Sequence, residues 1–408
     1  MNVIDKYLGG KVVGKQKRWM FCLILLIALG FEGFRFFYWK NSYNILYYFA
    51  LLLIVFSFLL SFKSLKVGHF SNYVLFFALF PFVSVINTIS MGESYTTSII
   101  QTFKTSALWL VYYLLHSYNV KERTLLKMML YIGIFIAIVE IIQQFTYPHI
   151  LFGGYSSEDL QNGTTEELEI RNGFIRFRCH INLYFTMPFI LLLLEWIANR
   201  INAKMVLLFV FLTISVYLTL TRQIITSFIF VFFFSLFYRK KIRILSLVLF
   251  FIAFAVILVN ISFLVGGFIE QTRDEFGEDN IRLLAANYFW KESIKSPLAF
   301  LLGYGHPLEF EQNLATNLHF YIADIGFIGA IWRFGVIFVI FNYYLMYKLF
   351  VKHKDTTPRY IKLFVLYAAI MSIMIYPFTS NIMTLIWPIL LYICDLRIDR
   401  SPLALQQV

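Results

Sequence analysis

The chain has 408 residues, of which 60% are hydrophobic, 20% aromatic and only 14% charged, and its mean hydropathy is +0.72. Soluble globular proteins carry roughly 25% charged residues, so this composition excludes soluble enzymes, DNA-binding proteins and secreted disulfide scaffolds. The net charge of +12 then indicates basic cytoplasmic loops rather than nucleic-acid binding. The three cysteines, Cys22, Cys179 and Cys394, show no disulfide or metal-ligand spacing.

Apolar windows of about 20 residues, the length that crosses a bilayer, recur along the whole chain. They predict an all-α fold, a polytopic transmembrane bundle of about 12 helices in a single membrane domain covering residues 1–408. The window at 320–350 is long for one crossing, so we expect it to start tilted or partly re-entrant. The windows are 19–38, 44–62, 70–90, 96–117, 124–146, 181–198, 204–221, 223–238, 244–265, 320–350, 360–377 and 381–396.

The basic residues predict the orientation of these windows. If the N-terminus is cytoplasmic, most of the 35 lysines and arginines fall in inner segments, as the positive-inside rule requires. We therefore expect both termini in the cytoplasm and a multi-pass protein of the cytoplasmic (inner) membrane. No small-residue cleavage site follows the first window, which favours an anchor over a removed signal peptide.

Two outer segments, 147–180 and 266–318, are too long for simple turns, and long ordered loops are usually functional. In the second, Asp279 is a possible cap for a helix that continues to about Ser296, where Pro297 stops it. We expect this helix to be amphipathic and to lie on the membrane or across the mouth of a cavity. Its expected apolar positions are Ile281, Leu284, Ala285, Tyr288 and Phe289.

Several cations are not explained by topology. Arg222 lies between two apolar runs, where a charge costs about 2.5–3.5 kcal/mol; it either reaches water at a helix hairpin or lines a cavity and binds an anion. Arg176 and Arg178 would point the same way on an extended chain and suit a diphosphate, or they balance the acidic half of their own loop. Lys104, within the fourth window, either faces the same cavity or pairs with Glu140.

The second outer segment continues with Gly303-Tyr304-Gly305, which permits a tight turn with exposed backbone N–H groups. His319 then opens the tenth window. A single histidine at a membrane interface is more often a structural hydrogen-bonding group than a catalyst, but imidazole titrates near neutral pH, which suits a general base.

The order of these features resembles the bacterial O-antigen polymerase and O-antigen ligase superfamily, over roughly residues 170–335 by motif. The matching motifs are Thr219-Leu220-Thr221-Arg222, the run Arg282…Trp290…Pro297-Leu298…Gly303-Tyr304-Gly305, the helix opening His319…Asp324-Ile325-Gly326…Gly329 and, more loosely, Arg176…His180-Ile181-Asn182.

The resemblance implies an inverting glycosyl transfer from an undecaprenyl-diphosphate-linked oligosaccharide to the hydroxyl of an acceptor glycan, at the outer face of the membrane and without metal or cofactor. By resemblance, Arg222 and Arg282 hold the diphosphate, and Arg176 or Arg178 assists them. His319 is the expected base, with Glu309, Glu311 and Asp324 as weaker candidates. Asp324 and Tyr304 are expected substrate contacts.

The chain departs from the ligase branch in one position, because Phe320 follows the motif histidine where that branch often has asparagine. This favours a repeat-unit polymerase. A ligase that moves finished glycan to a lipid or protein acceptor, and a transporter or flippase for lipid-linked glycan, stay open as alternatives. The expected partners are the lipid-linked glycan, the acceptor glycan, membrane lipid and a chain-length regulator protein, with no nucleic acid.

Overall fold

The computed structural model describes residues 42–61, 67–146, 170–171, 174–175, 184–199, 202–219, 221–237, 281–353, 355–378 and 381–399. Several predictions lie outside these residues. They concern the windows 19–38 and 244–265, Cys22, Cys179, Asp279, most of the first outer segment with Arg176 and Arg178, and the side chain of Arg222.

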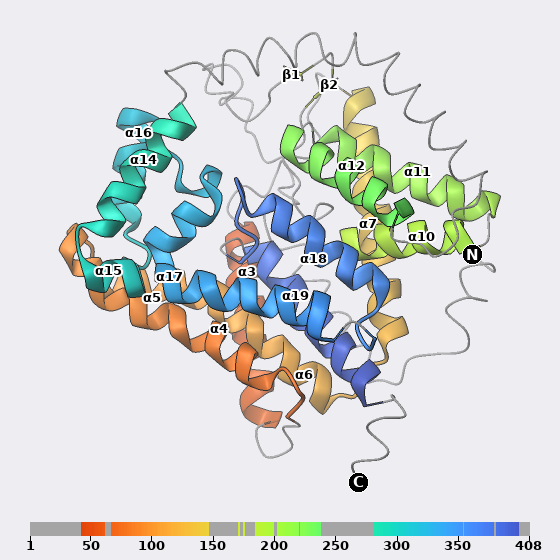
Figure 1. Cartoon of the computed structure of the whole chain (residues 1–408), viewed down its shortest axis with the longest axis horizontal. Coiled ribbons are helices and arrows are strands. Elements are labelled where there is room, and N and C mark those ends of the chain that lie inside the picture. The colour runs from red at the N-terminus through yellow and green to blue at the C-terminus, as the bar shows by residue number, and fades with distance from the viewer. Residues whose placement is uncertain are drawn as a thin grey trace.

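The described residues are mostly helical, as predicted (Figure 1). Apart from one two-residue hairpin, β1 (Ile170–Arg171) with β2 (Phe174–Ile175), the elements are α3 Ser42–Ser61, α4 Ser71–Ser84, η2 Val85–Met91, α5 Tyr95–Ser106, η3 Ala107–Leu110, α6 Val111–Ser117, α7 Glu122–Thr146, α10 Met187–Asn199, α11 Ala203–Leu218, α12 Arg222–Phe237, α14 Ile281–Ile294, α15 Pro297–Leu302, α16 Leu308–Leu318, η4 Ile322–Asp324, α17 Gly326–Tyr347, the π-helix η5 Lys348–Lys352, α18 Arg359–Met371 and α19 Asn381–Ile398.

Within the described residues, three helices are long and apolar enough to cross a membrane. They are Ser71–Met91, Glu122–Thr146 and Gly326–Lys352, and shorter apolar helices cover Tyr48–Ser61, Met187–Asn199, Ala203–Leu218 and Gln223–Ser235. Polar caps set several helix starts: Ser94, Asn202 and Ser296 each accept a hydrogen bond from the backbone of the following first turn.

Helices from several parts of the chain pack around α17, α18 and α19 (Figure 1), and α14 and α15 pack on α17. Helix α18 lies against α10 and α12, whereas α17 packs on α4, and α19 packs on η3 and α6. An aromatic stack fills the contact between α19 and η3, because the Phe378 ring lies 4.4 Å from the ring of Trp387 and 6.2 Å from the ring of Trp109. Part of the high aromatic content therefore lies in the buried core.

The described bundle has two polar ends, named here after a residue in each. At the Asp395 end, Arg397 bonds Glu122 and the Tyr392 hydroxyl donates to the Val120 carbonyl at 2.6 Å. At the opposite Asp324 end, the Glu309 backbone N–H donates to Glu93 at 2.8 Å. Helix α7 begins at the first end, at Glu122.

The predicted amphipathic helix is present as α14, and the prediction of its buried face is partly wrong. Ala285 and Phe289 are buried as expected, together with Ser293. Ile281 and Leu284 are exposed, because the side of α14 that packs on α17, α15 and η4 buries Ala285, Phe289 and Ser293 instead. The expected stop is correct: α14 ends at Ile294, and Pro297 begins the next helix.

Candidate functional site

The second outer segment packs into a break in α17. Gly335 interrupts this helix with φ 80° and ψ 164°. Two carbonyls beside the break are bonded from outside: Tyr304 N–H donates to Trp332 O at 2.8 Å, and Gly305 N–H donates to Arg333 O at 2.7 Å. The prediction that the Gly-Tyr-Gly segment exposes its N–H groups is therefore wrong for these two residues, because both groups bond the broken helix.

The same segment is held from its other side by η2 and α5. Asn87 Nδ2 donates to Gly303 O at 2.8 Å, and Thr88 Oγ1 donates to Tyr304 O at 2.8 Å. The Ser98 hydroxyl accepts the His306 backbone N–H at 3.2 Å. Glycine is required at 303, where φ is +79° and a Cβ would lie 2.2 Å from Arg333 O. The segment is thus fixed between three helices.

A half-buried ion pair lies beside this segment. Arg333 Nε donates to Glu311 Oε1 at 2.9 Å and its second nitrogen donates to Oε2 at 2.5 Å, with both side chains 15% exposed. Such a two-bond pair fixes both groups. Glu311, one of the weaker candidates for a base, is therefore engaged with Arg333, whereas Glu309 is exposed.

His306 has an unusual environment that sequence patterns did not reveal. Its Nε2 atom is buried, and no described residue hydrogen-bonds it. Burial, and then the charges of Arg333 and Lys104, hold the pKa of His306 well below its usual range, so the ring is neutral. Lys104 Nζ also lies 5.2 Å from the centre of the Tyr48 ring. Lys104 is therefore near His306 and α3, whereas Glu140 contacts Ser215 of α11.

The predicted site residues differ in exposure. His319 is exposed and ends α16 in the left-handed region, with φ 55°, and Arg282 is exposed on the first turn of α14. Asp324 is half-buried at the end of η4. Tyr304 is 5% exposed, and its hydroxyl donates to Glu292 O at 3.2 Å; burial raises the pKa of this phenol. Tyr304 thus supports α14.

Backbone contacts bring the predicted residues to one end of the bundle. Gln223 Nε2, next to Arg222, donates to Met371 O at 2.8 Å. The following carbonyl, Ser372 O, accepts Phe327 N–H at 2.9 Å, three residues after Asp324. The Phe320 ring, next to His319, lies 5.8 Å from Tyr288 of α14, the helix that carries Arg282. Separate stretches of the chain therefore meet at the Asp324 end.

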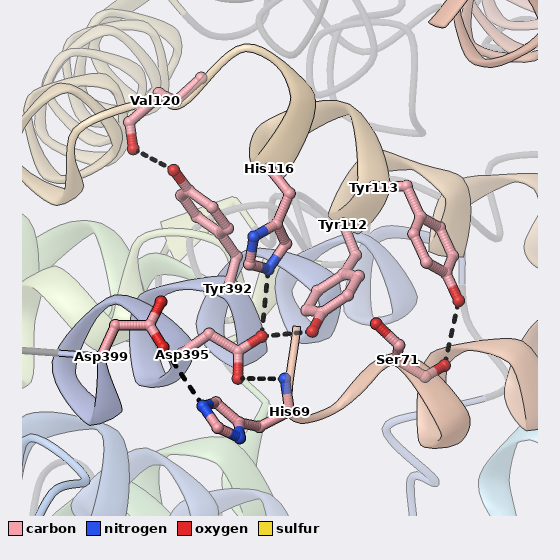
Figure 2. A network of polar contacts seen from close by, with 9 residues as sticks. All are labelled: His69, Ser71, Tyr112, Tyr113, His116, Val120, Tyr392, Asp395 and Asp399. Atoms are coloured by element: carbon pink, nitrogen blue, oxygen red, sulfur yellow. Dashed lines mark hydrogen bonds and ion pairs between the residues drawn. The ribbon is translucent and has the colours of Figure 1, made fainter. Parts of the chain in front are cut away.

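The Asp395 end contains a second polar cluster (Figure 2). Sequence patterns did not predict this cluster. Asp395 is fully buried, and its carboxylate accepts hydrogen bonds from the Tyr112 hydroxyl, from His116 Nε2 at 3.0 Å and from His69 N–H at 3.1 Å. The His69 ring lies 3.2 Å from Asp399. No sequence spacing could predict contacts between residues this far apart. The one available sign was the acidic Asp395 near the end of the apolar window 381–396.

This cluster fits a structural role. The carboxylate oxygens of Asp395 are satisfied by donors from the protein, as a buried charge requires. The described residues contain no group of three or more histidine, cysteine or acidic side chains able to hold a metal ion. The Asp324 end, where η4 packs on α14 and where Arg282 and His319 are exposed, is therefore the better candidate for chemistry.

No protein-family model, curated protein or solved structure matches this chain. The family resemblance of the motifs thus stays a prediction. The functional argument depends on the motifs and on the geometry of the Asp324 end.

Proposed function

We propose that this protein is a polytopic membrane glycosyltransferase that polymerises polysaccharide repeat units of the O-antigen, capsule or exopolysaccharide type. The donor is a glycan on undecaprenyl diphosphate, and the acceptor is a sugar hydroxyl at the outer face of the cytoplasmic membrane. In the reaction, the acceptor oxygen bonds the anomeric carbon with inversion. The bond from that carbon to the diphosphate breaks, its electron pair leaves with the phosphate oxygen, and a base takes the hydroxyl proton.

The two polar ends support the membrane topology in this proposal. Segments that the positive-inside rule assigns to the cytoplasm, around Val120 and Arg397, meet at the Asp395 end. Segments assigned to the outside, around Glu93 and Glu309, meet at the other. A bundle of about 12 spans with cytoplasmic termini is consistent with this division, and it makes the Asp324 end the outer face.

The observation that carries the proposal is the convergence at the Asp324 end. The start of α12 with Arg222, α14 with Arg282, and the His319–Asp324 segment come from separate parts of the chain and share this end. The leaving group carries charge that grows in the transition state, and fixed cations aimed at such charge are often the largest catalytic contribution. Exposed His319 then accepts the proton, and no metal or cofactor is invoked.

Purified protein supplied with lipid-linked repeat units tests the proposal. Wild type should produce a ladder of products, and Arg222→Ala should abolish it while the protein still folds. Arg359→Ala removes an arginine that lies far from this site and bonds the Ser235 carbonyl at 2.7 Å, so it serves as the matched control. A ladder of normal length from Arg222→Ala would remove Arg222 from the site.

The same assay separates the alternatives. A single transfer to a lipid or protein acceptor indicates a ligase, and movement of lipid-linked glycan between leaflets without a new bond indicates a transporter. One observation counts against a transporter. Unwound carbonyls in transporter helices often coordinate the driving ion, whereas two carbonyls beside the break in α17 accept N–H groups from Tyr304 and Gly305.

A further inference from the structure

An exposed apolar stripe runs along the second half of the helix Gly326–Lys352, one of the three that are long and apolar enough to cross a membrane. Ile340, Tyr344 and Tyr347 recur at i, i+4 and i+7, the spacing of one helical face, and they are 58%, 45% and 54% exposed. Val351 of η5 is exposed as well and extends the stripe. Tyrosines on a spanning helix are typical of the membrane–water interface, so the stripe faces lipid where hydrocarbon meets headgroups.

Two lysines lie at the end of the stripe. Lys348 Nζ lies 4.6 Å from the centre of the Tyr73 ring and 5.8 Å from that of Phe70, and it donates to the Tyr73 hydroxyl at 3.3 Å. The Tyr73 ring in turn lies 6.2 Å from Tyr344 of the stripe. Lys352 is exposed at the end of the same helix. Among the described residues, neither lysine forms an ion pair with a carboxylate.

The helix ends beside the Asp395 cluster. The His353 ring lies 5.6 Å from Phe70, whose neighbour His69 donates its backbone N–H to Asp395. The acids of this cluster have their own partners, since Asp395 accepts the bonds drawn in Figure 2 and Asp399 lies 3.2 Å from the His69 ring. Burial, and then the charges of the two lysines, lower the pKa of His353, although Asp395 acts in the opposite direction. Both lysines therefore contribute positive potential at this end of the helix.

We infer that the stripe and the two lysines bind an anionic phospholipid, with an acyl chain along the stripe and the phosphate at Lys348 and Lys352. The lysines are four residues apart and are therefore neighbours on the helix surface. The rings of Tyr73 and Phe70 hold Lys348 in place, so binding costs less ordering than it would for a lysine extended into water. In the proposed topology, the lipid belongs to the cytoplasmic leaflet. The site is remote from the proposed donor site and does not depend on the polymerase reaction.

A merely structural role makes a different prediction. If the lysines only complement the carbonyl groups at the C-terminal end of the helix, Lys348→Gln combined with Lys352→Gln should lower stability equally in phosphatidylglycerol and phosphatidylcholine nanodiscs. If they bind the headgroup, phosphatidylglycerol should raise the melting temperature of the wild type above its value in phosphatidylcholine. The double variant should then lose that rise.

Binding of single lipids to the purified full chain, followed by native mass spectrometry, tests the inference directly. Phosphatidylglycerol should bind the wild type at least about tenfold more tightly than phosphatidylcholine with the same acyl chains, and the double variant should lose this preference. Lys121→Gln combined with Lys204→Gln is the matched control, because it removes the same charge from two exposed lysines that the positive-inside rule also assigns to the cytoplasm. This control should keep the preference. Equal affinity of the wild type for the two lipids, or an equal loss in the control, would overturn the inference.

Two further measurements complete the test. Soluble glycerol phosphate carries the phosphate without acyl chains, so it should not displace phosphatidylglycerol; displacement at matched concentration rejects a lipid as the occupant. If the double variant does not fold, Lys352→Gln decides, because that side chain is exposed. A weaker preference for phosphatidylglycerol in Lys352→Gln supports the site, and an unchanged preference rejects it.

Discussion

Replacement of Gly335 by alanine should separate the second outer segment from α17. At φ 80° and ψ 164°, Gly335 occupies a backbone region that essentially only glycine adopts. A Cβ there would lie 2.1 Å from the Leu301 carbonyl oxygen. That oxygen belongs to the backbone of α15, so no side-chain rotation relieves the clash. Either α17 straightens or α15 moves away.

The expected cost follows from these contacts. The unfavourable backbone conformation costs about 1–3 kcal/mol. Displacement of the segment also breaks the bonds from Tyr304 to Trp332 and from Gly305 to Arg333, each worth about 1 kcal/mol. Gly335→Ala should therefore lower the free energy of unfolding by about 3–5 kcal/mol.

Gly92 provides the matched control, because it has nearly the same φ, +80°, but a Cβ there would meet nothing within 4 Å. Gly92→Ala should cost only the intrinsic left-handed penalty, about 1–2 kcal/mol. Denaturant unfolding of both variants in the same detergent measures the difference. Equal losses for the two variants would refute the argument that the contact between α15 and α17 depends on Gly335.

Three further substitutions test other contacts. Asp395→Asn should leave a buried donor unsatisfied and cost about 1–3 kcal/mol in a thermal melt, whereas exposed Asp399→Asn should change little. Glu311→Gln should lower the free energy of unfolding by about 1–3 kcal/mol. A double-mutant cycle with Arg333→Gln should show coupling between the two residues, and additive losses would contradict the Glu311–Arg333 ion pair. Because the pKa of His306 is lowered in the folded state, only the unfolded chain binds its proton below about pH 6.5. Stability should fall by up to about 1.4 kcal/mol per pH unit there, and His306→Gln should flatten that slope.

Helix positions were predictable because long apolar runs of helix length can be read directly from the sequence. The windows at 70–90 and 124–146 correspond closely to Ser71–Met91 and Glu122–Thr146. The start of the tenth window, 320–350, was not predictable in detail, because hydropathy carries no information on where the backbone geometry changes. The structure begins α17 at Gly326 and breaks it at Gly335, and glycine in an apolar run gives no signal that distinguishes a break from ordinary packing.

The candidate site was only partly predictable, for a related reason. Motif order drew attention to Arg282, His319 and Asp324, and in the structure η4, which ends at Asp324, packs on α14, which carries Arg282. The roles of His306 and Asp395 depend on contacts between residues hundreds of positions apart, such as His306 with Ser98. One sequence without tertiary contacts cannot show which polar residues will be neighbours.

The hydrogen bonds to Asp395 have a consequence for biogenesis. The acceptor is synthesised 279 residues after His116 and 326 residues after His69. Early segments of the chain therefore wait for the last described helix before their donors find the carboxylate. A ribosome that stalls before codon 395 therefore leaves a nascent product whose first helices lack this shared acceptor.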